Sequence, residues 1–206
     1  MRVVLTGFGP FPGAPFNPSA ALVKTLARRR RPAFAKIDRV VHVFATTYAA
    51  VDRDLPKLFA QKPDIILMFG LAGRRRKLCI ESQARNAITV LFPDAEGHRP
   101  QRSAISLGKA TSLRGGAPFA RLLGAVGPSG FPARLSRDAG RYLCNYAYWR
   151  ALERAGRGGT LVQFVHIPPI RFRPGTKRYG KRRPLSFLTL VGAAERLLVA
   201  LIAARR

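Results

Sequence analysis

Acidic residues are scarce in this chain of 206 residues. Ten Asp and Glu stand against 37 Lys and Arg, which gives a formal net charge of +27. Such a surface attracts nucleic acids and anionic membranes without any dedicated site. Aromatic residues are not interleaved with the arginine runs, and no zinc-finger or basic-zipper spacing occurs. The charge therefore allows non-specific attraction to nucleic acid but does not by itself predict a dedicated nucleic-acid-binding protein.

Cysteine is also scarce, with only Cys79 and Cys144 in the chain. Two cysteines cannot form the disulfide framework of a small secreted protein, and they lack the paired spacing of a zinc site. The apolar run after Met1 is too short for the core of a signal peptide. The segment Leu185–Ala204 is rich in apolar residues, but Glu195 and Arg196 interrupt it. We expect an amphipathic helix there, no membrane span, and a cytoplasmic protein.

Short apolar runs alternate with helical patterns along the whole chain, of which 47% is hydrophobic. This alternation predicts one α/β domain over residues 1–206 with a mostly parallel sheet. Strands are expected at Arg2–Phe8, Ile37–Thr46, Asp64–Phe69, Ala133–Ser136 and Thr160–Ile167, with a strand or hairpin within Lys77–Val90. Helices are expected at Ser19–Arg30, Tyr48–Gln61, Pro118–Val126, Gly140–Ala155 and Leu185–Ala204. Pro56 is expected to kink or end the second helix, and Phe92–Gly116 to form a long loop.

Ligands of open α/β sheets bind beyond the carboxyl ends of the strands. Phe8-Gly9-Pro10-Phe11 follows the first predicted strand, and Gly70-Leu71-Ala72-Gly73 follows the third. His166 ends the last strand, and Cys144 lies near the start of a helix. We expect these four places to converge on one rim of the sheet.

Cys144 is the candidate nucleophile. A thiolate attacks carbonyl groups far better than a thiol does, and a helix N-terminus lowers the pKa of a thiol. The free N–H groups of the first helical turn can also stabilise an oxyanion. The alternative is a buried structural cysteine. Cys79 competes for the same role, but it has neither a helix start nor a glycine turn beside it.

His166 is the candidate general base, which would later protonate a leaving amine. The alternative is a histidine held by hydrogen bonds for structural reasons. Glu81 is the candidate carboxylate that orients this imidazole. Its alternative is a salt bridge to one of four neighbouring arginines, namely Arg74, Arg75, Arg76 and Arg85.

Four segments together resemble pyroglutamyl peptidase I, the pyrrolidone-carboxylate peptidase family. Thr6-Gly7-Phe8-Gly9-Pro10-Phe11 with Asn17-Pro18-Ser19 is similar to the family's N-terminal signature. Gly70-Leu71-Ala72-Gly73-Arg74 with Glu81, Ala84 and Asn86 is similar to its glutamate region. Ala139-Gly140 with Cys144-Asn145, and Val165-His166-Ile167-Pro168, are similar to its cysteine and histidine regions. The segments occur in the family's order and spacing up to about residue 168.

The resemblance implies a three-layer α/β/α sandwich and a cysteine peptidase that removes an N-terminal pyroglutamyl residue through a thioester. It implies catalytic roles for Cys144, His166 and Glu81, and no metal or cofactor. Phe8, Phe11, Asn17 and Gly70 match family positions at the substrate. Aromatic walls and a few hydrogen bonds suit a flat, uncharged lactam ring. The resemblance also implies a homo-oligomer, commonly a tetramer.

Four features depart from the family pattern, and one is the added charge of Arg74–Lys77 just before the glutamate strand. Ser82 follows the glutamate where the family usually has arginine, and Arg141 follows Gly140 where it usually has a small hydroxyl residue. Arg171–Arg183 carries seven Lys or Arg residues and no acid. Two other functions therefore stay open. One is a weakened or inactive relative that binds nucleic acid or another anionic partner. The other is an amidase for a different blocked substrate.

Overall fold

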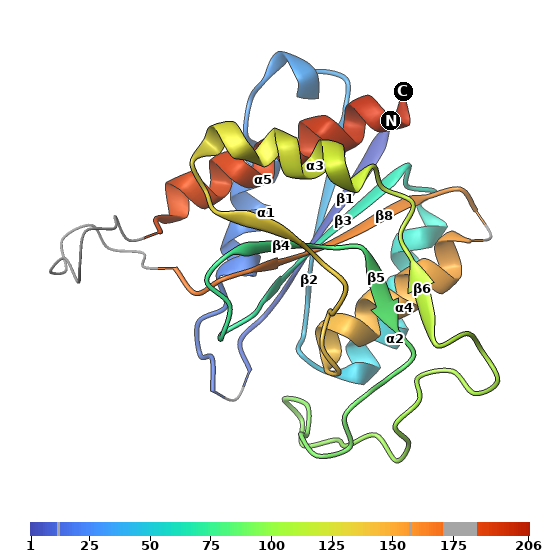
Figure 1. Ribbon diagram of the computed structural model, residues 1–206. Helices are drawn as coiled ribbons and strands as arrows, with labels where there is room; N and C mark the ends of the chain where they lie inside the picture. Colours follow the sequence, from blue (N-terminus) through green and yellow to red (C-terminus); the bar gives the residue numbers. More distant parts are fainter. Residues whose placement is uncertain (12, 157, 171–184) are drawn as a thin grey trace, which may run out of the picture.

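The computed structural model describes residues 1–11, 13–156, 158–170 and 185–206. A six-stranded sheet with the order β2-β1-β3-β8-β4-β7 forms its centre (Figure 1). The strands β2, β1, β3 and β8 run parallel, whereas β4 is antiparallel to β8 and β7 is parallel to β4. This confirms the predicted mostly parallel sheet. Its strands are β1 Arg2–Phe8, β2 Asp38–Phe44, β3 Ile65–Leu71, β4 Leu78–Glu81, β7 Ala133–Ser136 and β8 Leu161–Ile167.

Helices cover both faces of this sheet, as the predicted α/β/α sandwich requires. Figure 1 shows α3 and α5 side by side on one face, and α1 packs on the same side. The opposite face carries α2 and α4. The helices are α1 Pro18–Arg28, α2 Tyr48–Ala60, α3 Phe119–Val126, α4 Leu143–Ala155 and α5 Phe187–Arg205, with short 3₁₀ turns at Pro32–Phe34 and Gly127–Ser129.

The sequence of β3 shows why it lies inside the sheet. Every residue from Ile65 to Phe69 is fully buried, because helices cover both faces of this continuous apolar run. Ile65, Leu67 and Phe69 face the layer of α1, α3 and α5, whereas Ile66 and Met68 face the layer of α2 and α4. The alternation along one strand thus divides the core into two halves.

The start of α1 follows the predicted capping pattern. The Asn17 side chain accepts a hydrogen bond from the Ser19 backbone N–H, and Pro18 occupies the first helical position. The start of α4 differs from the prediction: the helix begins at Leu143, not at Gly140. Gly140 has a φ of +83°, which is incompatible with a right-handed helix.

Two further expectations are corrected. Of the two alternatives for Pro56, a break is wrong, because α2 continues past it to Ala60, and a kink stays a prediction. The expected loop 92–116 contains strand β6, Ser112–Arg114, which pairs antiparallel with β5, Gln83–Arg85. The stretch 77–90 therefore supplies two strands to two different sheets. The basic segment 171–183 lies outside the described residues.

The C-terminal helix α5 is long and apolar enough to cross a membrane by length and composition. However, 56% of its most apolar stretch is buried in the protein, and buried core helices meet the same criterion. Glu195 does not lie on a solvated face as an amphipathic pattern predicts. It is buried, and it forms ion pairs with Arg29 at 3.3 Å and with Arg31.

Candidate active site

The structure joins Glu81 and His166 by a buried hydrogen bond. His166 Nδ1 lies 2.8 Å from Glu81 Oε1, and the side chain of Glu81 is fully buried. Glu81 ends β4, and His166 lies one residue before the end of β8, its antiparallel neighbour. Two segments 85 positions apart in the sequence therefore meet through strand pairing. The bond to Nδ1 leaves His166 Nε2 as the nitrogen available to a substrate or nucleophile.

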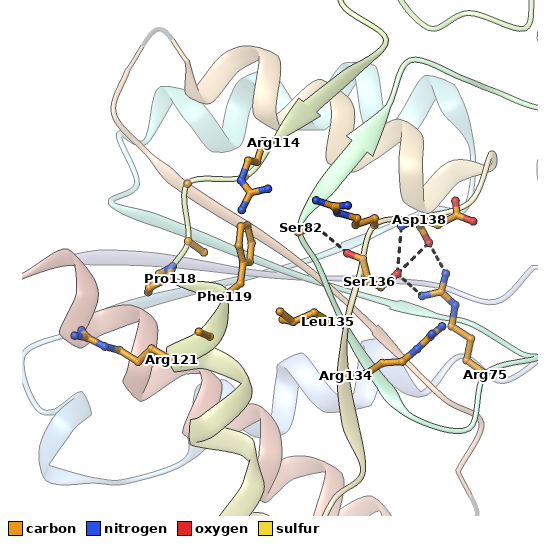
Figure 2. Close-up of a pocket in the computed structure, with 15 residues that line it drawn as sticks. Arg75, Ser82, Arg114, Pro118, Phe119, Arg121, Arg134, Leu135, Ser136 and Asp138 are labelled. Carbon is orange, nitrogen blue, oxygen red and sulfur yellow. Dashed lines mark hydrogen bonds between the residues drawn. The ribbon is translucent and has the colours of Figure 1, made fainter.

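Arg75 binds the same carboxylate oxygen. Its Nη1 atom donates to Glu81 Oε1 at 2.5 Å and to Ser136 Oγ at 3.3 Å, and its Nη2 atom donates to the Asp138 carbonyl. Figure 2 shows the bonds from Arg75 to Ser136 and Asp138. The salt bridge that the sequence offered as the alternative for Glu81 is therefore present beside the bond to His166, whereas the role of Glu81 as an orienting carboxylate in catalysis stays a prediction.

Cys144 occupies the second residue of α4, as predicted for a thiol at a helix N-terminus. It packs against Gly70 of β3, the residue that pairs in register with His166 of β8. A Cβ atom on Gly70 would lie only 2.7 Å from Cys144 Sγ. Within the described residues, no hydrogen bond joins this thiol to His166. The sheet nevertheless brings Cys144, His166 and Glu81 to one place. Cys144 contacts Gly70 of β3, and β3 pairs with β8, the strand that carries His166.

The protonation states follow from burial. Burial, and after it the nearby Glu81 charge, raises the pKa of the Cys144 thiol to about 12, although Arg75 and the cysteine's own backbone N–H oppose this change. Burial also lowers the pKa of His166, against the bond to Glu81. At neutral pH the resting pair is therefore a thiol and a neutral imidazole. A reaction at this site must begin with proton transfer from sulfur to nitrogen.

Two buried side chains hold the main chain of Glu81, and the sequence reasoning missed both. The Tyr148 hydroxyl and Gln163 Nε2 donate to the Glu81 carbonyl at 3.1 and 3.0 Å. Gln163 is fully buried in an otherwise apolar stretch of β8. A lone polar residue inside such a strand was the available signal, because a buried amide requires a partner.

The residues expected at the substrate lie at the same end of the sheet. Phe8 is buried at the end of β1, where its ring packs on Phe44 at a centroid distance of 5.6 Å. Phe11 is half-buried in the turn that its backbone forms with Ala14. Asn17 Nδ2 donates to the Gly9 carbonyl at 3.0 Å, so this side chain also shapes the loop between β1 and α1.

Two of the departures from the family pattern, Ser82 and Arg141, lie in different surroundings. Ser82 is buried, and its hydroxyl donates to the Ser136 carbonyl at 3.0 Å. It therefore ties β4 to β7. Arg141 is exposed, and its carbonyl accepts a hydrogen bond from the Thr89 N–H. The competing cysteine, Cys79, is fully buried inside β4, where its sulfur accepts a hydrogen bond from Arg134 Nε at 3.3 Å.

A thiol at a helix N-terminus, near an imidazole that is held by a carboxylate, is the set of groups of a cysteine hydrolase. Across the described residues, no three His, Cys, Asp or Glu side chains gather as metal ligands would. A sequence model of the pyroglutamyl peptidase family matches residues 1–196. The chain belongs to this family of cysteine peptidases.

Individual relatives show the same likeness over most of the chain. The pyrrolidone-carboxylate peptidase of Thermococcus onnurineus is 30% identical over 202 residues, which cover 97% of each chain. That of Bacillus amyloliquefaciens is 33% identical over 172 residues, covering 82% of this chain and 79% of the relative. The crystal structure of Bacillus amyloliquefaciens pyroglutamyl peptidase I superposes with a TM-score of 0.84 at 29% identity. That superposition covers 99% of this chain and 98% of the relative.

Proposed function

We propose that this protein is a cysteine peptidase that removes an N-terminal pyroglutamyl residue from peptides through a thioester. The observation that carries the proposal is the buried bond from Glu81 to His166, with Cys144 packed on the neighbouring strand position, in a chain of the pyroglutamyl peptidase family. The likeness of whole chains supports the pyroglutamyl substrate.

In this proposal His166 Nε2 takes the proton of the Cys144 thiol as the sulfur attacks the pyroglutamyl carbonyl carbon. Backbone N–H groups in the first turn of α4 stabilise the oxyanion of the tetrahedral intermediate. The imidazolium then gives its proton to the leaving amine as the C–N bond breaks, which leaves a thioester. Water, deprotonated by His166, hydrolyses the thioester and restores the thiol. Glu81 orients the imidazole and stabilises its charged form.

The lactam ring is assigned to Phe8, Phe11, Asn17 and Gly70. Phe8 and Gly70 lie near the carboxyl ends of the neighbouring strands β1 and β3, and Phe11 and Asn17 lie in the loop after β1, at the edge where α/β sheets bind ligands. The absence of a side chain at Gly70 leaves room for the thiol beside the sheet. The uncharged ring requires no ion pair, in agreement with the apolar surroundings of Phe8.

The first test is release of a fluorophore from a pyroglutamyl amide at neutral pH with a reductant present. We expect turnover by the wild type, none above background by Cys144→Ala, and nearly full turnover by Cys79→Ala. The matched cysteine variant controls for the loss of a thiol as such. Full activity of a folded Cys144→Ala protein would contradict the assignment of the nucleophile.

The net charge of +27 favours one second function, an anion-binding role of a relative with weakened catalysis. Binding to an unrelated DNA duplex at increasing salt tests it. Tight binding that persists at high salt would support a dedicated partner, whereas steep weakening without sequence preference indicates electrostatic attraction alone. A panel of other blocked aminoacyl amides tests the third possibility, an amidase for a different substrate.

The remaining expectations belong to the same proposal. We place the whole chain in one peptidase domain, which the family match to residues 1–196 and the two helical layers on one sheet support. We place the protein in the cytoplasm as a homo-oligomer, commonly a tetramer. Exposed apolar side chains such as Leu188 and Leu91 offer surfaces for such an assembly. Sedimentation at micromolar concentration measures the oligomeric state.

A further inference from the structure

A groove of about 1210 Å³ runs beside strand β7, next to the candidate active site. Figure 2 shows its two walls. The strand and the turn after it, residues 134–138, form one wall. The segment 114–121, which leads into α3, forms the other, and Arg75 and Ser82 also line the groove.

The lining of this groove is strongly basic. Asp138 is the single acidic residue in the lining. Five arginines line the groove, namely Arg75, Arg114, Arg121, Arg134 and Arg137. Arg75 is bound to Glu81, but within the described residues no carboxylate pairs with the other four arginines. Arg114 lies over the ring of Phe119 at 5.3 Å, which holds its guanidinium at the wall. Unpaired guanidinium groups along a concave surface attract carboxylates and can bind them with two hydrogen bonds.

The main chain of β7 offers a second binding feature. β7 is the last strand of the sheet, and among the described residues only β4 pairs with it. The Ser136 and Pro132 carbonyls accept bonds from the β4 side, and alternation along a strand turns the N–H and C=O groups of Leu135 outward. The side chain of Leu135 is also 41% exposed. An open strand edge of this kind can take up an extended peptide as an additional strand.

The groove begins where the candidate catalytic residues end. Arg75 lines the groove and binds Glu81, which binds His166, and Ser82 directly follows Glu81. The path from Arg75 to the reactive imidazole nitrogen of His166 consists of two hydrogen bonds of ordinary length, the Glu81 carboxylate and the imidazole ring. This end of the groove therefore lies on the order of 10 Å from that nitrogen. An extended peptide advances by roughly 3.3–3.6 Å per residue. About three residues beyond the scissile bond therefore reach the arginines.

We propose that this groove binds the downstream part of the peptide substrate as a strand along β7, and that it selects acidic residues about three to five positions after the pyroglutamyl group. This inference rests on the proposed peptidase function and specifies its substrate class. The open strand edge and the exposed Leu135 favour a peptide over a nucleic acid, because they offer main-chain hydrogen bonds and an apolar contact.

The test compares three pyroglutamyl peptides of equal length whose downstream positions carry glutamate, glutamine or lysine. For the wild type we expect kcat/KM to be at least about tenfold higher for the glutamate peptide than for the lysine peptide, mainly through KM. The preference should shrink as salt is raised, because exposed charges are screened. The variant Arg121→Glu/Arg137→Glu should abolish or invert the preference.

The matched control is Lys24→Glu/Lys36→Glu, which makes the same change in net charge at two exposed residues near α1, toward the edge of the sheet opposite β7. It should keep the wild-type preference. Equal cleavage of all three peptides by the wild type, or an equal change for all three in the Arg121→Glu/Arg137→Glu variant, would overturn the proposal.

Binding of the labelled glutamate peptide to the Cys144→Ala protein separates this inference from the proposed function. If no pyroglutamyl amide is cleaved but the peptide still binds in an Arg121- and Arg137-dependent way, the groove assignment stands and the peptidase assignment fails. If cleavage occurs without charge preference, the peptidase stands and the groove assignment fails. Equal displacement of the peptide by a single-stranded RNA of the same charge would also contradict selection of an acidic peptide.

Discussion

Gly70→Ala is the sharpest perturbation of the candidate site. A Cβ atom there would lie 2.7 Å from Cys144 Sγ and 2.8 Å from Phe164 Cζ. Unstrained carbon contacts are about 3.5–4.0 Å, so a shift of roughly 1 Å is needed. Phe164 is fully buried and cannot move away, so we expect the thiol to be displaced. Such overpacking costs about 1–3 kcal/mol, and misplacing a reacting group by about 1 Å costs roughly 10²-fold in rate.

The assay is kcat/KM for a pyroglutamyl amide together with a thermal melt. We expect Gly70→Ala to lower kcat/KM by about two orders of magnitude while Tm falls only by several degrees. Gly73→Ala is the matched control, because a Cβ atom at Gly73, just after β3, would meet nothing within 4 Å. Wild-type activity in a folded Gly70→Ala protein would refute the placement of the thiol against β3.

Three further changes test other parts of the structure. Arg75→Met should lower kcat/KM by about ten- to a hundredfold, the equivalent of losing a hydrogen bond to a charged group. It should also shift the pH profile of kcat/KM to higher pH, because the Arg75 charge lowers the pKa of both His166 and Cys144. Arg75→Lys keeps the charge and should leave the profile in place. An unshifted profile in Arg75→Met would count against this electrostatic role. Although burial opposes it, Arg31 and Arg29 hold the pKa of Glu195 below its ordinary value. This carboxylate therefore stabilises the fold above its ordinary pKa, and the contribution is lost as pH falls through the lowered value. Melts of Glu195→Gln should accordingly show a deficit at pH 7 that narrows in acid, and a constant deficit would contradict the linkage. Asn17→Ala should lower the free energy of unfolding by about 0.5–2 kcal/mol, measured by chemical denaturation, because α1 loses its cap. A rise in KM as well would support contact with the lactam. Unchanged stability together with an unchanged KM would contradict both roles.

Local patterns in the sequence were sufficient for most of the fold. The continuous apolar run at Ile65–Phe69 predicts a strand that is covered on both faces. The pair Asn17-Pro18 predicts the start of a helix. These signals depend only on residues that are neighbours in the chain, so they can be recognised without knowledge of the tertiary structure. Boundaries were less certain where a single backbone conformation decides them. Gly140 delays α4 by three residues because its φ is positive, which the sequence pattern did not show.

The choice of residues at the site shows the same division. Cys144 and His166 could be singled out because each lies near the end of a predicted element, and Glu81 because glutamate is scarce in the chain; the resemblance of four segments to one family supports all three. Tyr148 and Gln163 could not be singled out, because their contacts with Glu81 join positions far apart in the chain. The role of Arg75 could not be predicted, because four similar arginines lie near Glu81 in the sequence.

The sequence by itself therefore determined the alternation of strands and helices, the overall charge and the choice of candidate catalytic residues, since these depend on local composition and order. Only the tertiary structure decided which arginine binds Glu81, that β4 runs antiparallel to β8, and that Gly70 makes room for a thiol. Strand pairing sets these distances across tens of residues, and no local pattern encodes them. The basic groove beside β7 has the same origin, because its two walls meet only when the chain is folded.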